Sequence, residues 1–131
     1  MSRLPYVLSA LALAGLVGCS SSGPDVPDES AFAEGTCRTA AADVRAVGQS
    51  LPELGDGGAV DGDVRAGLRE AHDRLRALTD GAEPALQPVL AELNEKIGIV
   101  RIRADGNTYE TQFGEQLTAS YERVLEACTT R

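Results

Sequence analysis

Apolar residues recur at every third or fourth position in four segments of this chain, and this periodicity constrains the fold more than any other feature. The four segments are 37–51, 61–78, 86–100 and 109–128. Such spacing puts the apolar side chains on one face of an α-helix and leaves the opposite face polar. We therefore predict an all-α fold in which four amphipathic helices pack as an up-and-down bundle.

Residues that commonly begin and end helices flank these segments. Pro52 stops the first pattern, and Asp61 is placed to cap the second, which ends at Gly81. Pro84 or Pro88 begins the third, because proline is tolerated only in the first turn of a helix. These signals predict four helix boundaries independently of the apolar spacing.

The junction between the third and fourth segments has two interpretations. Ile99 and Ile102 lie off the apolar stripe of the third segment, and a β-hairpin folded at Asp105-Gly106 would explain them. In the other interpretation the third helix continues, and Asn107 with Glu110 forms a capping box that opens the fourth helix. We favour the helices because the cap is consistent with them, with the hairpin as the alternative.

The first eighteen residues have the layout of a secretory signal. A short cationic start that includes Arg3 precedes an apolar run of fourteen residues, Leu4 to Val17. A helix needs roughly 20 apolar residues to cross the hydrocarbon core of a membrane. This run is shorter than that and polar sequence follows it, so we predict export rather than a permanent membrane span.

The end of this segment, Leu16-Val17-Gly18-Cys19, resembles the lipobox of bacterial lipoprotein precursors. The resemblance implies that the Cys19 sulfur takes a diacylglyceryl group and that a signal peptidase, recognising residues 16–18, cuts just before Cys19. Two or three acyl chains, at about 0.8 kcal/mol per buried CH₂, attach a protein stably to a membrane. The expected location is the extracytoplasmic face of the cell membrane. The alternative is an ordinary signal peptide that is cut elsewhere.

With Cys19 assigned to lipid, Cys37 and Cys128 remain, and an oxidising compartment allows them to form a disulfide. They lack the Cys-x-x-Cys spacing of redox sites, so we predict a structural bond. Bonded cysteines need Cα atoms within about 7 Å. Four antiparallel helices bring the start of the first and the end of the last to the same end, whereas three would not. We expect this end to be membrane-proximal, near the lipid.

These features divide the chain into three parts. Residues 1–18 are the predicted signal peptide, and residues 19–31 are the lipidated cysteine and a flexible tether rich in Ser, Pro and Asp. Residues 32–131 form the predicted bundle domain. This domain resembles, in its acidic charge and Ala-rich helices, the small lipoproteins that high-GC Gram-positive bacteria export.

Charge and composition argue against nucleic acid as a partner. The chain has 12 Lys and Arg against 20 Asp and Glu, a formal charge of -8, and only 4% aromatic residues. Removal of residues 1–18, whose only charged residue is Arg3, would leave 113 residues with a charge of -9. A surface this acidic repels phosphates, and stacking platforms for bases are scarce.

No candidate catalytic or metal-binding group in the bundle domain has the partners it needs. His72 is the only histidine and lacks a second ligand at helical spacing, so we interpret it as a surface residue. Gly57-Gly58 lacks the Lys and the Ser or Thr of a phosphate-binding loop. We therefore expect no cofactor and no metal.

Two sets of acidic residues also lack the partners or the spacing that a metal site or a catalytic pair requires. Asp56, Asp61 and Asp63 suit Ca²⁺ chemically, but Arg65 and Gly67 break the EF-hand pattern. The other set is a possible carboxylate pair, which nothing in the spacing brings together: Glu92 and Glu95 with Glu70 or Asp73. We interpret both sets as helix caps, turns and solvated helix faces.

The hypothesis that follows is a lipid-anchored, non-catalytic interaction or structural module of the cell envelope. If the helical interpretation of residues 99–113 holds, Ile99 and Ile102 form an exposed apolar pair and a candidate surface for an envelope protein partner. The other interpretation is that they pack under a loop or in a hairpin. The alternative function is a lipoprotein that binds a small ligand or a metal.

Overall fold

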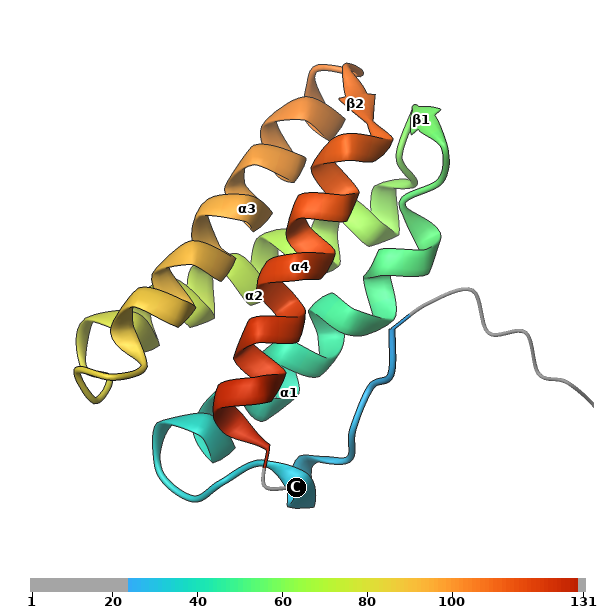
Figure 1. Cartoon of the computed structure of the whole chain (residues 1–131). Coiled ribbons are helices and arrows are strands. Elements are labelled where there is room, and N and C mark those ends of the chain that lie inside the picture. The colour runs from blue at the N-terminus through green and yellow to red at the C-terminus, as the bar shows by residue number, and fades with distance from the viewer. Residues whose placement is uncertain (1–23, 130–131) are drawn as a thin grey trace, which may run out of the picture.

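Four helices make up most of the computed structural model, which describes residues 24–129 (Figure 1). They are α1 (Thr36–Ser50), α2 (Gly62–Asp80), α3 (Gln87–Asp105) and α4 (Thr111–Cys128). Consecutive helices run antiparallel, and each of α1 and α3 packs against both α2 and α4. The predicted four-helix up-and-down bundle is confirmed.

The helix signals in the sequence place most of the boundaries correctly. Asp61 caps α2 by accepting a hydrogen bond from the Asp63 backbone N–H at 2.8 Å, and Gly81 follows the last residue of α2. Pro52 lies in the short 3-10 turn η2 (Leu51–Glu53) that follows α1, and Pro88 lies in the first turn of α3. Local backbone chemistry therefore sets these ends.

The junction between α3 and α4 confirms the favoured continuation of the third helix, rules out the hairpin alternative and corrects the predicted cap. Helix α3 continues through Ile99 and Ile102, so the hairpin at Asp105-Gly106 is wrong. The capping box is also wrong, because Asn107 adopts a positive φ of 56° and α4 begins only at Thr111. The residues between them form a strand, β2 (Tyr109–Glu110), that pairs antiparallel with the distant strand β1 (Gly57–Gly58). This long-range pairing holds the chain extended where a local cap would have begun the helix.

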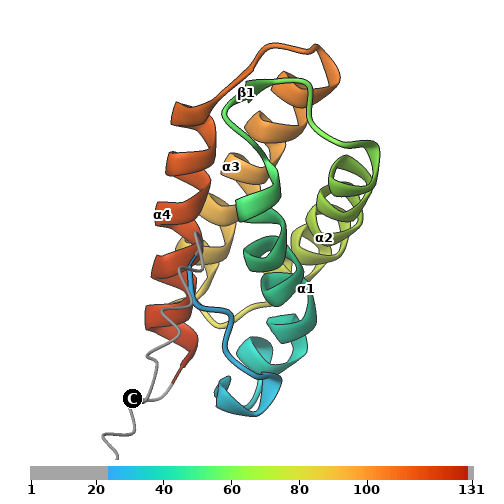
Figure 2. The same ribbon diagram turned by 90° about the vertical axis from the view of Figure 1, so that its right-hand side faces the viewer.

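Residues 25–32, which we call the strap, lie along α1 and α4 (Figure 2). The Tyr121 hydroxyl donates to the Asp25 carbonyl oxygen at 2.8 Å, and Arg45 Nε donates to the Pro27 carbonyl oxygen at 2.8 Å. A 3-10 turn, η1 (Glu29–Ala31), leads to Phe32, whose side chain is buried. The flexible tether predicted for residues 19–31 is therefore corrected in the part that the structure describes, because backbone carbonyls hold this part to the bundle.

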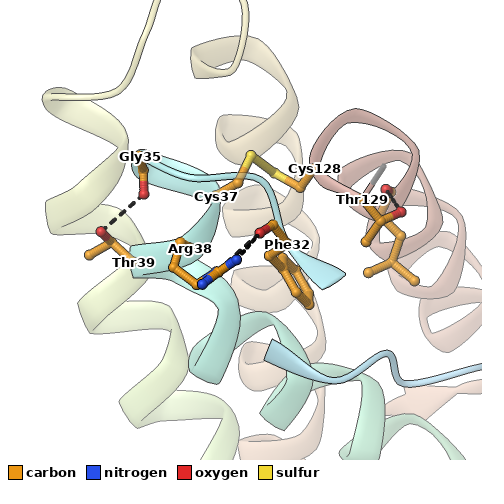
Figure 3. Close-up of a disulfide and its surroundings, with 8 residues drawn as sticks. Phe32, Gly35, Cys37, Arg38, Thr39, Cys128 and Thr129 are labelled. Atoms are coloured by element: carbon orange, nitrogen blue, oxygen red, sulfur yellow. Dashed lines mark hydrogen bonds between the residues drawn. A yellow bond between two sulfur atoms is a disulfide. The ribbon is translucent and has the colours of Figure 1, made fainter. Parts of the chain in front are cut away.

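A disulfide and a β-bridge tie the two ends of the bundle domain together (Figure 3). Cys37 in α1 and Cys128 in α4 are bonded, with their Cα atoms 5.3 Å apart, as predicted. Beside them Phe32 pairs with Thr129, and the Phe32 carbonyl oxygen accepts hydrogen bonds from Arg38 Nε at 3.0 Å and Nη2 at 2.8 Å. Followed along the sequence, the strap thus begins beside Tyr121, near the middle of α4, and ends at the disulfide with Phe32.

The core contains large side chains from all four helices. Its largest fully buried helical members are Val44, Val47, Leu68, Leu75, Leu90, Leu93, Ile97, Val100, Leu117, Tyr121 and Val124. The predicted apolar faces therefore meet in one core. Within residues 24–129, no helix combines the length and apolar character needed to span a membrane.

Two helical glycines make room for tyrosine side chains. A Cβ atom at Gly48 would lie 2.5 Å from the Tyr121 hydroxyl oxygen, and a Cβ atom at Gly114 would overlap the Tyr109 hydroxyl. Glycine in a helix interior costs roughly 0.5–1 kcal/mol relative to alanine. At these two positions that cost is offset by the close packing of a buried aromatic ring.

Gly48→Ala should lower the free energy of unfolding by about 1–3 kcal/mol, the usual cost of overpacking a core. Gly67 in α2 is the matched control, because a Cβ atom there meets nothing within 4 Å. Gly67→Ala should raise the stability by about 0.5–1 kcal/mol. Denaturant titration of both variants measures the difference, and equal effects would contradict the proposed packing of Tyr121.

Candidate functional site

The structure brings four of the residues singled out from the sequence, including Glu95 on α3, into one place. A shallow groove between α2 and α3, with a volume of about 420 Å³, is lined by His72 from α2 and by Ile99 and Ile102 from α3. We call it the α2–α3 groove. Leu16, Val17, Gly18 and Cys19, the residues of the predicted lipidation site, lie outside the described residues.

Ile102 is the exposed apolar residue of the groove. Its side chain is 73% exposed, and it is the only large apolar side chain classed as exposed within residues 24–129. Ile99, one turn earlier on α3, is half-buried. The structure therefore excludes packing of Ile102 under a loop and confirms the predicted exposure for Ile102, whereas Ile99 is only partly exposed.

His72 is half-buried rather than a free surface residue. Its ring lies over Gly98, where a Cβ atom would be 3.6 Å from Cε1. Arg101 Nη1 lies 2.5 Å from His72 Nδ1, and because a guanidinium can only donate, Nδ1 accepts and the ring proton resides on Nε2. Arg101 also lies 3.8 Å from a carboxylate oxygen of Asp73. These contacts hold the imidazole in one orientation.

The electrostatic surroundings keep His72 neutral. Burial, followed by the positive charge of Arg101, lowers the pKa of His72 below its ordinary value of 6.5, while Asp73 acts in the opposite direction. Since Arg101 occupies the Nδ1 lone pair, that nitrogen is unable to act as a general base or a metal ligand in this arrangement. The arrangement favours a structural role for the ring in the wall of the groove.

The polar floor of the groove is incompletely paired. Asn94, only 8% exposed, donates from Nδ2 to Thr79 Oγ1 at 2.8 Å, and Thr79 Oγ1 donates to the Leu75 carbonyl oxygen at 2.7 Å. Asn94 Oδ1 is buried and has no hydrogen-bond partner within the described residues, and the same holds for Arg101 Nε. An unpaired buried polar atom costs about 1–3 kcal/mol. The groove is thus a part of the bundle surface where buried polar atoms lack some of their hydrogen bonds.

The other acidic candidates are separated rather than gathered. Glu92 forms an ion pair with Arg123, whereas Glu70 lies 3.9 Å from Arg74 on its own helix. Asp56, Asp61 and Asp63 are exposed, and Gly57-Gly58 form β1. Residues 24–129 contain no group of three or more His, Cys, Asp or Glu side chains placed to hold a metal ion. The α2–α3 groove is therefore the place where the largest number of the candidate residues named from the sequence share one surface.

The single histidine makes the electrostatics of the groove measurable by NMR. The pKa of His72 should lie below 6.5, and Arg101→Met should raise it because a neighbouring positive charge is removed. Arg103→Met is the control, since Arg103 stacks on the Phe113 ring, 4.7 Å from its centroid. That control should leave the pKa of His72 unchanged.

The lowered pKa of His72 makes the free energy of unfolding depend on pH. The unfolded chain binds a proton at His72 more tightly than the folded protein does, so lowering the pH through about 6.5 should lower the free energy of unfolding. His72→Gln should remove this part of the pH dependence. A pKa of His72 at or above 6.5 in the folded protein would contradict the geometry.

Comparisons with protein-family models, with curated proteins and with solved structures find no match to this chain. A role for the α2–α3 groove has to follow from its own residues: an exposed Ile102 beside a half-buried Ile99, a histidine with a lowered pKa, and an incompletely paired floor. These features suit contact with another molecule better than they suit proton transfer.

Proposed function

We propose that this protein is a lipoprotein, anchored by Cys19 to the extracytoplasmic face of the cell membrane, that acts as a non-catalytic interaction or structural module of the cell envelope. The observation that carries the proposal is the order of features in residues 1–22. A cationic start, an apolar run, Leu16-Val17-Gly18-Cys19 and three serines follow one another as in lipoprotein precursors. Acyl chains on Cys19 would anchor the protein without a second membrane signal.

The cysteines support this proposal. The chain has three cysteines, and two of them form the disulfide at the end of the bundle. Disulfides persist in oxidising compartments outside the cytoplasm, which agrees with export. The remaining cysteine is Cys19, directly after the apolar run. Export, one disulfide and one lipid-bearing thiol together account for all three sulfur atoms.

The α2–α3 groove supports the interaction role. Ile102 and Ile99 present apolar surface next to the charged side chains of Arg76 and Glu95, which line the same groove. An apolar centre with a charged rim is typical of surfaces that contact another protein. The partner we propose is an envelope protein that covers Ile102.

Cys19→Ser should release the protein from the membrane. The substitution removes the thiol that takes the lipid, so protein that is cut at another position should appear in the soluble fraction, whereas protein that stays uncut should keep its signal segment and show a higher mass. Membrane fractionation and immunoblotting measure both outcomes, with Cys37→Ser/Cys128→Ser as the control that keeps Cys19. Normal processing and full membrane partition of the Cys19→Ser variant would contradict the anchor.

Photo-crosslinking in intact cells tests the interaction surface. A photoreactive amino acid at Glu95, on the rim of the groove, should give one crosslinked product of defined mass, and Ile102→Glu should abolish it. The same amino acid at the exposed Glu126 on α4 is the control position. Because Ile102 is exposed, Ile102→Glu should change stability by less than about 0.5 kcal/mol. Equal products from Glu95 and Glu126, unaffected by Ile102→Glu, would contradict the role of the groove.

A further inference from the structure

The strap shortens the connection between the bundle and the proposed lipid anchor. Without the strap contacts, the chain from Cys19 to Phe32 would span up to about 45 Å when extended. With the strap in place, only the six residues 19–24 precede the held Asp25, and they reach at most about 20 Å. The described chain therefore begins its contact with the bundle close to the anchor in sequence.

The strap lies on one side of a two-layered bundle. The strap runs beside α1 and α4 (Figure 2), which it contacts through Arg45 and Tyr121. The groove with Ile102 lies between α2 and α3. Helix axes in contact lie about 8–10 Å apart and each helix is about 10–12 Å wide, so two layers are about 20 Å thick. A path from the α1–α4 side to the opposite side has to cover this thickness and also part of the width of the bundle, so a connection of at most about 20 Å cannot reach the opposite side.

We propose that the strap orients the bundle on the membrane, with the α1–α4 side toward the lipid and the α2–α3 groove facing away from it. This inference rests on the proposed lipid anchor at Cys19. It deepens the proposed function, because it assigns the partner-binding side: Ile99 and Ile102 face the envelope outside the membrane, where another protein reaches them without competing with lipid.

The strap has several independent attachments. The Tyr121 ring is fully buried against Gly48, and its hydroxyl donates to the Asp25 carbonyl oxygen at 2.8 Å. Burial, with Asp25 nearby, raises the pKa of Tyr121 to about 12, so the hydroxyl keeps its proton at any physiological pH. Arg45 donates to the Pro27 carbonyl oxygen and pairs with Glu29 at 3.7 Å. Phe32 anchors the other end in the core.

The position of the strap also changes where the membrane connection leaves the bundle. The sequence predicted that the chain to the membrane leaves the bundle at the disulfide end, because the predicted tether joins the bundle close to Cys37. In the structure Asp25 lies beside Tyr121, the eleventh of the eighteen residues of α4. The connection therefore starts from the side of the bundle, about 10 Å along the helix from Cys128.

Energy transfer to labelled lipids tests this orientation. The chain contains no tryptophan, so Glu122→Trp on α4, in a hollow shared with Leu51 at the end of α1, and Ile102→Trp in the groove each provide a single donor. The lipidated protein is reconstituted in vesicles that carry dansyl-labelled lipid headgroups. Transfer from position 122 should exceed transfer from position 102 at least about twofold, because the strap keeps the α1–α4 side near the anchor.

Two variants test whether the strap causes the difference in energy transfer between positions 122 and 102. Insertion of about twelve Ser and Gly residues after Gly23 lengthens the connection without altering the bundle, and it should bring the ratio of the two transfers toward one. Tyr121→Phe with Arg45→Gln should do the same by weakening the strap. Thermal melting of each variant confirms that the bundle remains folded.

The outcomes distinguish the two proposals. Transfer from neither position would overturn the lipid anchor and the orientation together. Membrane attachment with equal transfer from both positions, or a ratio that the insertion leaves unchanged, would overturn the orientation and leave the anchor standing. A ratio above about two that collapses on insertion is the expected result.

Discussion

The disulfide between Cys37 and Cys128 is the constraint on which the rest of the structure depends. It joins the first turn of α1 to the last residue of α4, so only an even number of antiparallel helices can lie between them. Closing a loop of this length restricts the unfolded chain by roughly 4–5 kcal/mol in the chain-entropy model. The Phe32–Thr129 bridge extends the same junction, and the strap can therefore only run back along α1 and α4.

Small residues decide where the helices can approach one another. Gly48 and Gly114 admit the rings of Tyr121 and Tyr109, and Gly98 lies under the ring of His72. Each of these rings also links two elements: Tyr121 of α4 holds the strap, Tyr109 of β2 packs against α4, and His72 of α2 accepts a hydrogen bond from Arg101 of α3. The contacts of Tyr121 and His72 therefore connect packing in the core to the strap and to the α2–α3 groove, the two surfaces used in the proposals.

The sequence was informative where structure is local and uninformative where it depends on distant partners. The apolar spacing predicted all four helices, and Asp61 was correctly predicted as a cap. The capping box at Asn107 failed because β2 pairs with a glycine strand about fifty residues away, which no local pattern reveals. The strap was missed because the bundle binds its backbone carbonyls, which every residue possesses. The exposure of Ile102 followed from helical periodicity, whereas the link between His72 and Arg101 depends on how α2 and α3 pack.

The lipid proposed for Cys19 would give these features one purpose: the disulfide-bonded bundle, held by the strap on its α1–α4 side, would present its α2–α3 side to the envelope. Intact mass spectrometry of the protein purified from its native membrane tests this account most directly. The account predicts a mature chain that begins at Cys19, carries a diacylglyceryl group on that sulfur, and has Cys37 and Cys128 oxidised to one disulfide. A mature chain that begins elsewhere, or one that begins at Cys19 with an unmodified thiol, would contradict it.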